Sequence, residues 1–396
     1  MLEHGGKLRR AAVEYGIPLA EWLDLSTGIN PNGWPVPTLP PEVWQRLPED
    51  DDGLIEAACA CYGARHALAV AGSQAAIQAL PRLFRQLHGP CRVGIVSPGY
   101  AEHAQAWKRA GHTVVEFRHS RVGGDDGGAL DVLVLIHPNN PTGQTYAPET
   151  LLAWHAQLAQ RGGWCGQPPR SPSFAAPARG TPDSYALKRY DSAAPRGGAQ
   201  PALGRPGGWL VVDEAFMDAT PAFSLAAQAH LPGLIVLRSL GKFFGLAGAR
   251  VGFVLAEAAL LERLRDLLGP WTLNGPARHI ATLALRDTAW QAAARPQLIA
   301  AGARLADLLT RHGLPPSGGC ALFQRVETPR ADEIHAALAR QGILTRLFET
   351  LHPQGARRFR KAAEPPTAPL PALRFGLPGA DAEWTRLDAA LERVSR

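Results

Sequence analysis

A short glycine-rich segment contains three polar side chains that could hold a phosphate or react with a carbonyl group. Ser239, Lys242 and Arg250 follow an apolar run, Leu234 to Leu237, that is typical of a buried strand. Apolar neighbours partly desolvate Lys242, and desolvation favours the neutral amine that attacks an aldehyde. A P-loop is excluded because Phe243, rather than serine or threonine, follows the lysine. The segment predicts either a reactive lysine beside an anion or an ordinary surface loop.

Other polar groups follow predicted strands, at the positions where ligands bind in open α/β sheets. Gly72, Ser73 and Gln74 stand between an apolar strand and a helical pattern, so the backbone N–H groups there form a candidate phosphate site. Asn140 lies in a loop between two prolines, and Asp213 comes near the end of an apolar strand. Each signal has a structural alternative, such as a helix cap. Their order along the chain is therefore more informative than any one of them.

The elements that would position these residues predict an α/β protein with two domains. Apolar strands alternate with helical patterns as far as residue 255, which is the order of a mostly parallel sheet wrapped by helices. After residue 313 the pattern changes to that of a small α+β domain. We predict an N-terminal arm over 1–40, a large domain over 41–312 and a small domain over 313–396.

Two tracts, 165–206 and 352–371, interrupt this pattern. Both are rich in proline and lack apolar periodicity, which indicates a disordered insertion in the first case and an irregular one in the second. Copies of Gly-Gly-Trp flank the first tract, at 162–164 and 207–209, so removing one copy with the tract would leave a short connection.

Composition restricts the class of protein. The 396 residues carry a formal net charge of +6, and most of the excess lies in the tract 165–206, so a basic surface for nucleic acid is not predicted. No stretch approaches eighteen apolar residues, and the N-terminus lacks the apolar region of a signal peptide. The five cysteines lack metal-type spacing. We expect a cytoplasmic protein with no metal, membrane or nucleic-acid partner.

Together these features resemble, in order and spacing, the fold-type I enzymes that depend on pyridoxal 5′-phosphate (PLP). The sequence is most similar to the aminotransferase class I/II family, and especially to its histidinol-phosphate aminotransferase-like branch. The similarity covers nearly the whole chain outside the two tracts. It implies a large PLP-binding domain, a small α+β domain and a homodimer.

The resemblance implies a role for each candidate residue. Around the cofactor ring the implied contacts are a Schiff base with Lys242, a pairing of Asp213 with the pyridine nitrogen, a hydrogen bond of Asn140 to the phenolic oxygen, and stacking by Tyr100. The residues that would hold the cofactor phosphate are Gly72, Ser73, Gln74, Ser239 and Arg250. Arg374 would bind the substrate carboxylate, and the candidates for a substrate phosphate are His4, Asn30 and Arg346.

Narrower features resemble the threonine-phosphate decarboxylases of this group. They are His4-Gly5-Gly6, the segment Leu-Asp-Leu-Ser-Thr-Gly-Ile-Asn-Pro at 23–31, and Asp-Glu-Ala-Phe-Met-Asp at 213–218. The resemblance implies decarboxylation of L-threonine O-3-phosphate to (R)-1-amino-2-propanol O-2-phosphate in cobalamin biosynthesis. A histidinol-phosphate-type aminotransferase is an alternative, because both reactions need the same residues. A binding protein on a retired enzyme fold is a third, and the intact Lys242 and Asp213 argue against it.

Two positions depart from the family pattern. Many relatives carry a tyrosine three residues after the aspartate, where this chain has Phe216. Many also carry Tyr-Pro-Asp in a segment that reaches the cofactor phosphate of the neighbouring subunit, where this chain has Leu47-Pro48-Glu49. Each change removes a hydroxyl group, so we expect the cofactor to be held less tightly.

Overall fold

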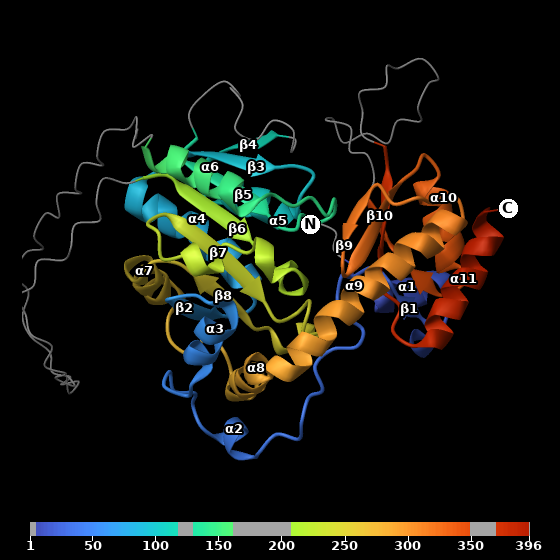
Figure 1. The fold of residues 1–396 in the computed structure, drawn as a ribbon, viewed down its shortest axis with the longest axis horizontal. Helices are drawn as coiled ribbons and strands as arrows, with labels where there is room; N and C mark the ends of the chain where they lie inside the picture. Colours follow the sequence, from blue (N-terminus) through green and yellow to red (C-terminus); the bar gives the residue numbers. More distant parts are fainter. Residues whose placement is uncertain (1–4, 118–129, 161–206, 349–369, 396) are drawn as a thin grey trace, which may run out of the picture.

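The computed structural model describes residues 5–117, 130–160, 207–348 and 370–395 (Figure 1). The tract 165–206, nearly all of the tract 352–371 and the candidate residue His4 lie outside the described residues. In the described ranges a large central sheet with its helices stands beside a smaller group of strands and helices (Figure 1).

The central sheet has seven strands and is mostly parallel, as predicted. Only β8 (Gly252–Leu255) runs antiparallel to its neighbours, β2 (Ala67–Val70) and β7 (Leu234–Ser239). The remaining pairs in the sheet are parallel. The middle strands are completely buried and are apolar apart from their last residues, Asp213, Arg238 and Ser239, which is typical of parallel strands covered on both faces. In spatial order the strands are β2 (Ala67–Val70), β8 (Gly252–Leu255), β7 (Leu234–Ser239), β6 (Trp209–Asp213), β5 (Val132–Ile136), β3 (Arg92–Val96) and β4 (Thr113–Phe117).

Helices cover both faces of this sheet. On one face α4 (Ser73–His88), α5 (Ala101–Arg109) and α7 (Ala258–Leu268) pack their apolar side chains against alternate strand residues. On the other face lie α3 (Leu54–Tyr62), α6 (Pro148–Gln160) and α8 (Gly275–Arg286). Two helices, α2 (Glu42–Gln45) and α3, lie in the segment 42–62. The first ends where Arg46 takes an extended conformation, and the second begins after Gly53, which has a left-handed conformation with φ of 80°.

One long helix connects the sheet with the smaller group of elements. The helical stretch over 275–311 is divided at Asp287 into α8 and α9 (Thr288–Arg311). Asp287 interrupts it because its backbone leaves the helical region, while its side chain accepts a hydrogen bond from Trp290 N and caps α9. From there α9 runs to the smaller group of elements, where it packs against β10 (Phe323–Glu327) (Figure 1). None of the described helices has the length and hydropathy needed to cross a membrane.

The smaller group is built on a four-stranded antiparallel sheet. Its spatial order is β12 (Arg346–Phe348), β13 (Ala372–Gly376), β10 and β9 (Gly318–Cys320), with α10 (Ala331–Ala339) and α11 (Asp381–Ser395) beside it. The extended segment 343–348 divides at Thr345, because the chain leaves one sheet there and enters another. Its first half, β11 (Ile343–Leu344), pairs with β1 (Leu23–Asp24).

The N-terminal segment therefore lies against the C-terminal elements. Besides the β1–β11 pairing, α1 (Leu8–Tyr15) packs beside α10 through a small apolar cluster that includes Ala11, Trp22 and Leu344. The exact boundaries at residues 40 and 312 stay a prediction.

Candidate active site

The predicted cofactor residues lie at one edge of the central sheet. The carboxyl ends of its parallel strands meet there, and this is where ligands bind in such sheets. Because β8 runs in the opposite direction, the residue just before it lies at the same edge. The residues in question are Gly72 to Gln74 after β2, Tyr100 after β3, Asn140 after β5, Asp213 at the end of β6, Ser239 and Lys242 at and after the end of β7, and Arg250 before β8.

Lys242 has the properties of a nucleophilic amine. Burial, followed by the nearby positive charge of Arg374, lowers the pKa of Lys242 to about 8, while Asp213 opposes the shift. A substantial fraction of the lysine is therefore neutral near that pH and able to attack a carbonyl carbon. The loop around it is fixed, because its carbonyl oxygen accepts hydrogen bonds from the backbone N–H groups of Asn30 and Gly245, at 3.0 and 3.1 Å.

Asp213 is held by a histidine that the sequence analysis did not single out. Its Oδ2 lies 2.9 Å from Nε2 of His103, in α5, and its Oδ1 accepts a hydrogen bond from Ala215 N at 3.1 Å. Both side chains are buried. An ionised carboxylate only accepts, so the histidine donates from Nε2. The available sequence signal was the place of His103 one turn after Tyr100, at the start of a helix that follows a strand ending at this edge.

The start of α4 and Arg250 form a cradle suited to an anion. Gly72 has φ of 70°, and a Cβ there would lie 2.7 Å from Nη2 of Arg250, so only glycine lets the guanidinium approach this closely. Ser239 pairs with Gly252 in the β7–β8 register, and a Cβ on Gly252 would in turn meet Ser73 N. The free N–H groups at the start of a helix and a guanidinium are both donors that favour a phosphate.

The Gln74 side chain connects this cradle to Tyr100. Its amide nitrogen donates to Oε2 of Glu102 at 3.0 Å, and its amide oxygen accepts from the Tyr100 hydroxyl at 3.3 Å. Burial, together with the charges of Glu102 and Asp213, raises the pKa of Tyr100 to about 12. The tyrosine is thus a neutral aromatic surface at this edge, and its stacking on a cofactor stays a prediction.

Two arginines face each other across β12 and β13. Arg374 is paired in register with Arg346, so both side chains start from the same face of the sheet. Arg374 is 6% exposed, and it donates to Oδ1 of Asn140 and, at 2.7 Å, to the backbone oxygen of Ser26. Burial lowers its pKa to about 10. The arrangement places two guanidinium groups on neighbouring strands, as a ligand with two anionic groups would require.

An aromatic pair lies between the lysine and this arginine. The rings of Phe216 and Phe323 meet edge to face, with centroids 5.2 Å apart. Nζ of Lys242 lies 5.3 Å from the centroid of Phe216, and Cζ of Arg374 lies 5.2 Å from that of Phe323. The lysine and arginine cations thus lie over two aromatic rings that contact each other. Each cation is attracted electrostatically to the face of its ring.

Asn30 is buried and bonded to the protein itself. Its side-chain nitrogen donates to Phe243 O at 2.8 Å, and its side-chain oxygen accepts from Asn32 N at 2.9 Å. These contacts tie the N-terminal segment to the Lys242 loop. The structure thus gives Asn30 a place beside the lysine, while its contact with a substrate phosphate stays a prediction.

The family model of aminotransferase class I and II matches residues 21–164 and 203–365, and the chain belongs to this family. It is 50% identical to a threonine-phosphate decarboxylase of Pseudomonas aeruginosa, over 99% of this chain and 97% of that protein. It is 36% identical to a threonine-phosphate decarboxylase of a Sinorhizobium species, over 87% of this chain and 90% of that protein. The predicted family and the predicted similarity to threonine-phosphate decarboxylases are both confirmed.

Solved structures show the same fold. A crystal structure of the histidinol-phosphate aminotransferase from Clostridium acetobutylicum superposes with a TM-score of 0.66, covering 94% of this chain and 99% of that one. At 17% identity this similarity concerns the fold alone. The fold-type I architecture predicted from the sequence is confirmed.

Proposed function

We propose that this chain is a PLP-dependent decarboxylase that converts L-threonine O-3-phosphate to (R)-1-amino-2-propanol O-2-phosphate and carbon dioxide in cobalamin biosynthesis. The observation that carries the proposal is the 50% identity, over nearly the full length of both chains, to a threonine-phosphate decarboxylase. The site supports it, because Lys242, Asp213 and Arg374 are brought together from distant parts of the sequence. A cytoplasmic location belongs to the same proposal.

The described residues fit PLP. The cradle of Gly72 and Arg250 offers donors to a phosphate, and Asp213 offers a buried carboxylate to a protonated ring nitrogen. Lys242 has the lowered pKa, about 8, that covalent attachment of an aldehyde requires. When bound, PLP supplies an electron sink for the pair of electrons left on the α-carbon as carbon dioxide departs.

The chain's own residues then have separate tasks. Asp213 would offer its carboxylate to the ring nitrogen, and His103 holds that carboxylate in a fixed direction. Lys242 Nζ, with its pKa of about 8, is able to carry a proton to the α-carbon. These two functions alone do not select decarboxylation, because transamination needs them too.

Orientation of the substrate makes that selection. Anchoring two anionic groups of the substrate would set the rotation about its Cα–N bond, and with it which of the remaining Cα bonds is placed to break when PLP takes up the electrons. Arg374 is proposed to hold the carboxylate and Arg346, its neighbour across the sheet, the phosphate. The closeness of the two arginines fits a small substrate with both groups, such as threonine phosphate.

A homodimer is part of the proposal. Large apolar side chains are exposed in and just before the segment that replaces the family's Tyr-Pro-Asp segment: Leu47 is 66% exposed, and Trp44, in α2, is 68% exposed. Trp271, in the connection between α7 and α8, is 61% exposed. Exposed apolar side chains of this size favour contact with another protein surface.

The proposal is tested by adding PLP and L-threonine O-3-phosphate to the purified protein and measuring release of carbon dioxide. Release by the wild type and its loss in Lys242→Ala are the expected results. A protein that binds PLP, releases no carbon dioxide and instead converts histidinol phosphate to a keto product would be a histidinol-phosphate-type aminotransferase. A protein that takes up no PLP at all would contradict both activities.

A further inference from the structure

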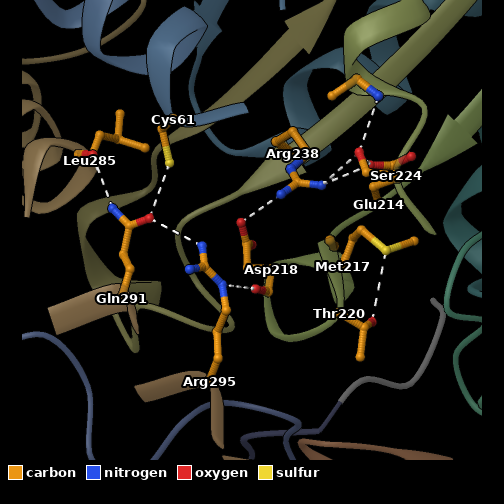
Figure 2. Close-up of polar contacts among 12 residues, drawn as sticks. Cys61, Glu214, Met217, Asp218, Thr220, Ser224, Arg238, Leu285, Gln291 and Arg295 are labelled. Carbon is orange, nitrogen blue, oxygen red and sulfur yellow. Dashed lines mark hydrogen bonds and ion pairs between the residues drawn. The ribbon is translucent and has the colours of Figure 1, made fainter. Parts of the chain in front are cut away.

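A buried cluster of charges is formed around residues that adjoin the proposed active-site residues in the chain, and Figure 2 shows its polar contacts. Arg238 donates from Nη1 to Oε2 of Glu214 at 2.7 Å and from Nη2 to Oδ1 of Asp218 at 2.6 Å. All three side chains are at most 4% exposed. The guanidinium also lies over the ring of Tyr62 in α3, 4.4 Å from its centroid. None of these residues has a part in the proposed reaction.

The cluster is joined to the active site through the backbone. Glu214 follows Asp213, and Arg238 precedes Ser239, so each charged residue is the chain neighbour of a proposed cofactor residue. Successive side chains of an extended strand point to opposite faces. Asp213 accordingly meets His103 of α5, on one face, while Arg238 meets Tyr62 of α3, on the other.

The cluster also fixes the two strand ends to each other. Asp213 is paired with Leu237 in the β6–β7 register, and Glu214 N donates to Leu237 O at 2.9 Å. Beyond that point the backbone ladder ends, and the ion pair between Arg238 and Glu214 continues the connection. The other oxygen of Glu214 accepts from Leu225 N at 2.7 Å, which fixes the turn that follows β6.

A second connection leads to α9. Nε of Arg295 donates to the backbone oxygen of Asp218 at 3.1 Å, and its Nη2 donates to Oε1 of Gln291 at 3.3 Å. Gln291 in turn donates to the last turn of α8 at Leu285 O, at 3.0 Å (Figure 2). The turn after β6 is therefore held between the sheet and the helix that leads to the small sheet.

Stability alone does not account for such a cluster. Burying three charges is costly, and well-packed neutral residues of similar volume are often as stable or more stable. Its pairing is also incomplete, because Oδ2 of Asp218 and Nε of Arg238 are buried without a hydrogen-bond partner among the described residues. The need to fix the orientation of these side chains explains the cluster better, because a planar guanidinium holds two carboxylates at defined angles.

We propose that Arg238, Glu214 and Asp218 form a positioning element for the active site. It fixes the carboxyl ends of β6 and β7, and so the directions in which Asp213 and Ser239 project toward the cofactor. This inference rests on the proposed PLP-dependent function, and its test includes a measurement that needs neither cofactor nor substrate.

The test replaces the three charges together, because removing Arg238 alone would leave two buried carboxylates unpaired. In the combined variant R238M/E214Q/D218N no buried charge remains, and the variant is expected to fold. We expect kcat to fall by about tenfold or more while KM for threonine phosphate changes little, because substrate contacts are untouched. In the cofactor-free protein the proton on Nε2 of His103, observed by NMR in ¹⁵N-histidine-labelled protein, is expected to shift or broaden.

The matched control is Leu264→Ala. It creates a cavity beneath α7, on the face of the central sheet opposite to the cluster. It is expected to lower the thermal midpoint while leaving kcat and the His103 proton signal as in the wild type. If the combined variant keeps both the wild-type kcat and the wild-type His103 signal, the cluster is structural only and the inference is wrong. If the wild type lacks activity toward threonine phosphate, the proposed function fails, and the His103 signal still decides whether the cluster positions Asp213.

Discussion

Nε2 of His103 lies 2.9 Å from Oδ2 of Asp213, although 109 residues separate the two in the chain. The other carboxylate oxygen accepts a backbone N–H from Ala215 at 3.1 Å. Both oxygens of Asp213 are therefore oriented by the protein before any ligand is present. A carboxylate held in this way keeps its direction toward the proposed ring nitrogen without needing to reorganise during the reaction.

Replacing His103 with leucine is expected to reduce kcat by about 10- to 100-fold, the range for loss of a hydrogen bond to a charged group. PLP should still bind, because Lys242 and the phosphate cradle are intact. Steady-state kinetics with saturating PLP measure the effect. The matched control is His155→Asn in α6, a buried histidine that donates to Pro232 O at 2.9 Å and lies away from the site. An unchanged kcat in His103→Leu would contradict the role given to His103.

Lys242→Met in the cofactor-free protein is expected to give a pH-dependent gain in stability. The folded protein releases the lysine proton with a pKa of about 8, and the unfolded chain does so near the ordinary value of 10.5. Between these values the unfolded chain binds more protons, so the wild type gains stability as pH rises. The variant should exceed the wild type by at most about 3 kcal/mol below pH 8 from this cause.

That difference should shrink between about pH 8 and 10.5 and then disappear, since the lysine is neutral in both states above the unfolded pKa. Urea unfolding of both proteins across this range gives the two free energies of unfolding. A difference that stays constant through pH 10.5 would show that the folded protein does not depress the lysine pKa.

Phe216→Tyr is expected to tighten PLP binding by up to about tenfold, the value of one additional hydrogen bond. The residue is 4% exposed, and its ring lies 5.3 Å from the amine of Lys242, so a new hydroxyl would enter the proposed cofactor site. Titration of the cofactor-free protein with PLP measures the dissociation constant. Phe216→Leu, which removes the ring without adding a hydroxyl, is the comparison. Weaker binding by the tyrosine variant than by the wild type would contradict the prediction.

Arg374→Lys is expected to raise KM for threonine phosphate by about 10- to 100-fold, because lysine retains the charge but loses the two parallel donors. Arg325→Lys is the matched control. This buried arginine is the register partner of Arg374 on β10, but its guanidinium donates to Ser317 Oγ at 3.0 Å and pairs with Glu327 at 2.7 Å. Equal changes of KM in the two variants would show that Arg374 has no special part in substrate binding.

Much of the site was predictable from the sequence for a simple geometrical reason. Apolar runs identify the strands, and the carboxyl ends of parallel strands meet at one edge. Polar residues that follow separate runs, such as Asn140, Asp213 and Lys242, are therefore expected to lie together even with no knowledge of the contacts between them. The family resemblance then gave chemical roles to residues that order alone could not distinguish.

Other features depended on the tertiary structure. The contact of His103 with Asp213, the register that faces Arg346 with Arg374, and the cluster around Arg238 each join residues from separate elements. A single sequence shows which side chains can form such pairs but not which do, because a shift of one residue in strand register would turn each side chain to the other face. The sequence by itself therefore determined the class of fold and the residues available for chemistry. Only the packing of helices and strands decided which of those residues orient one another.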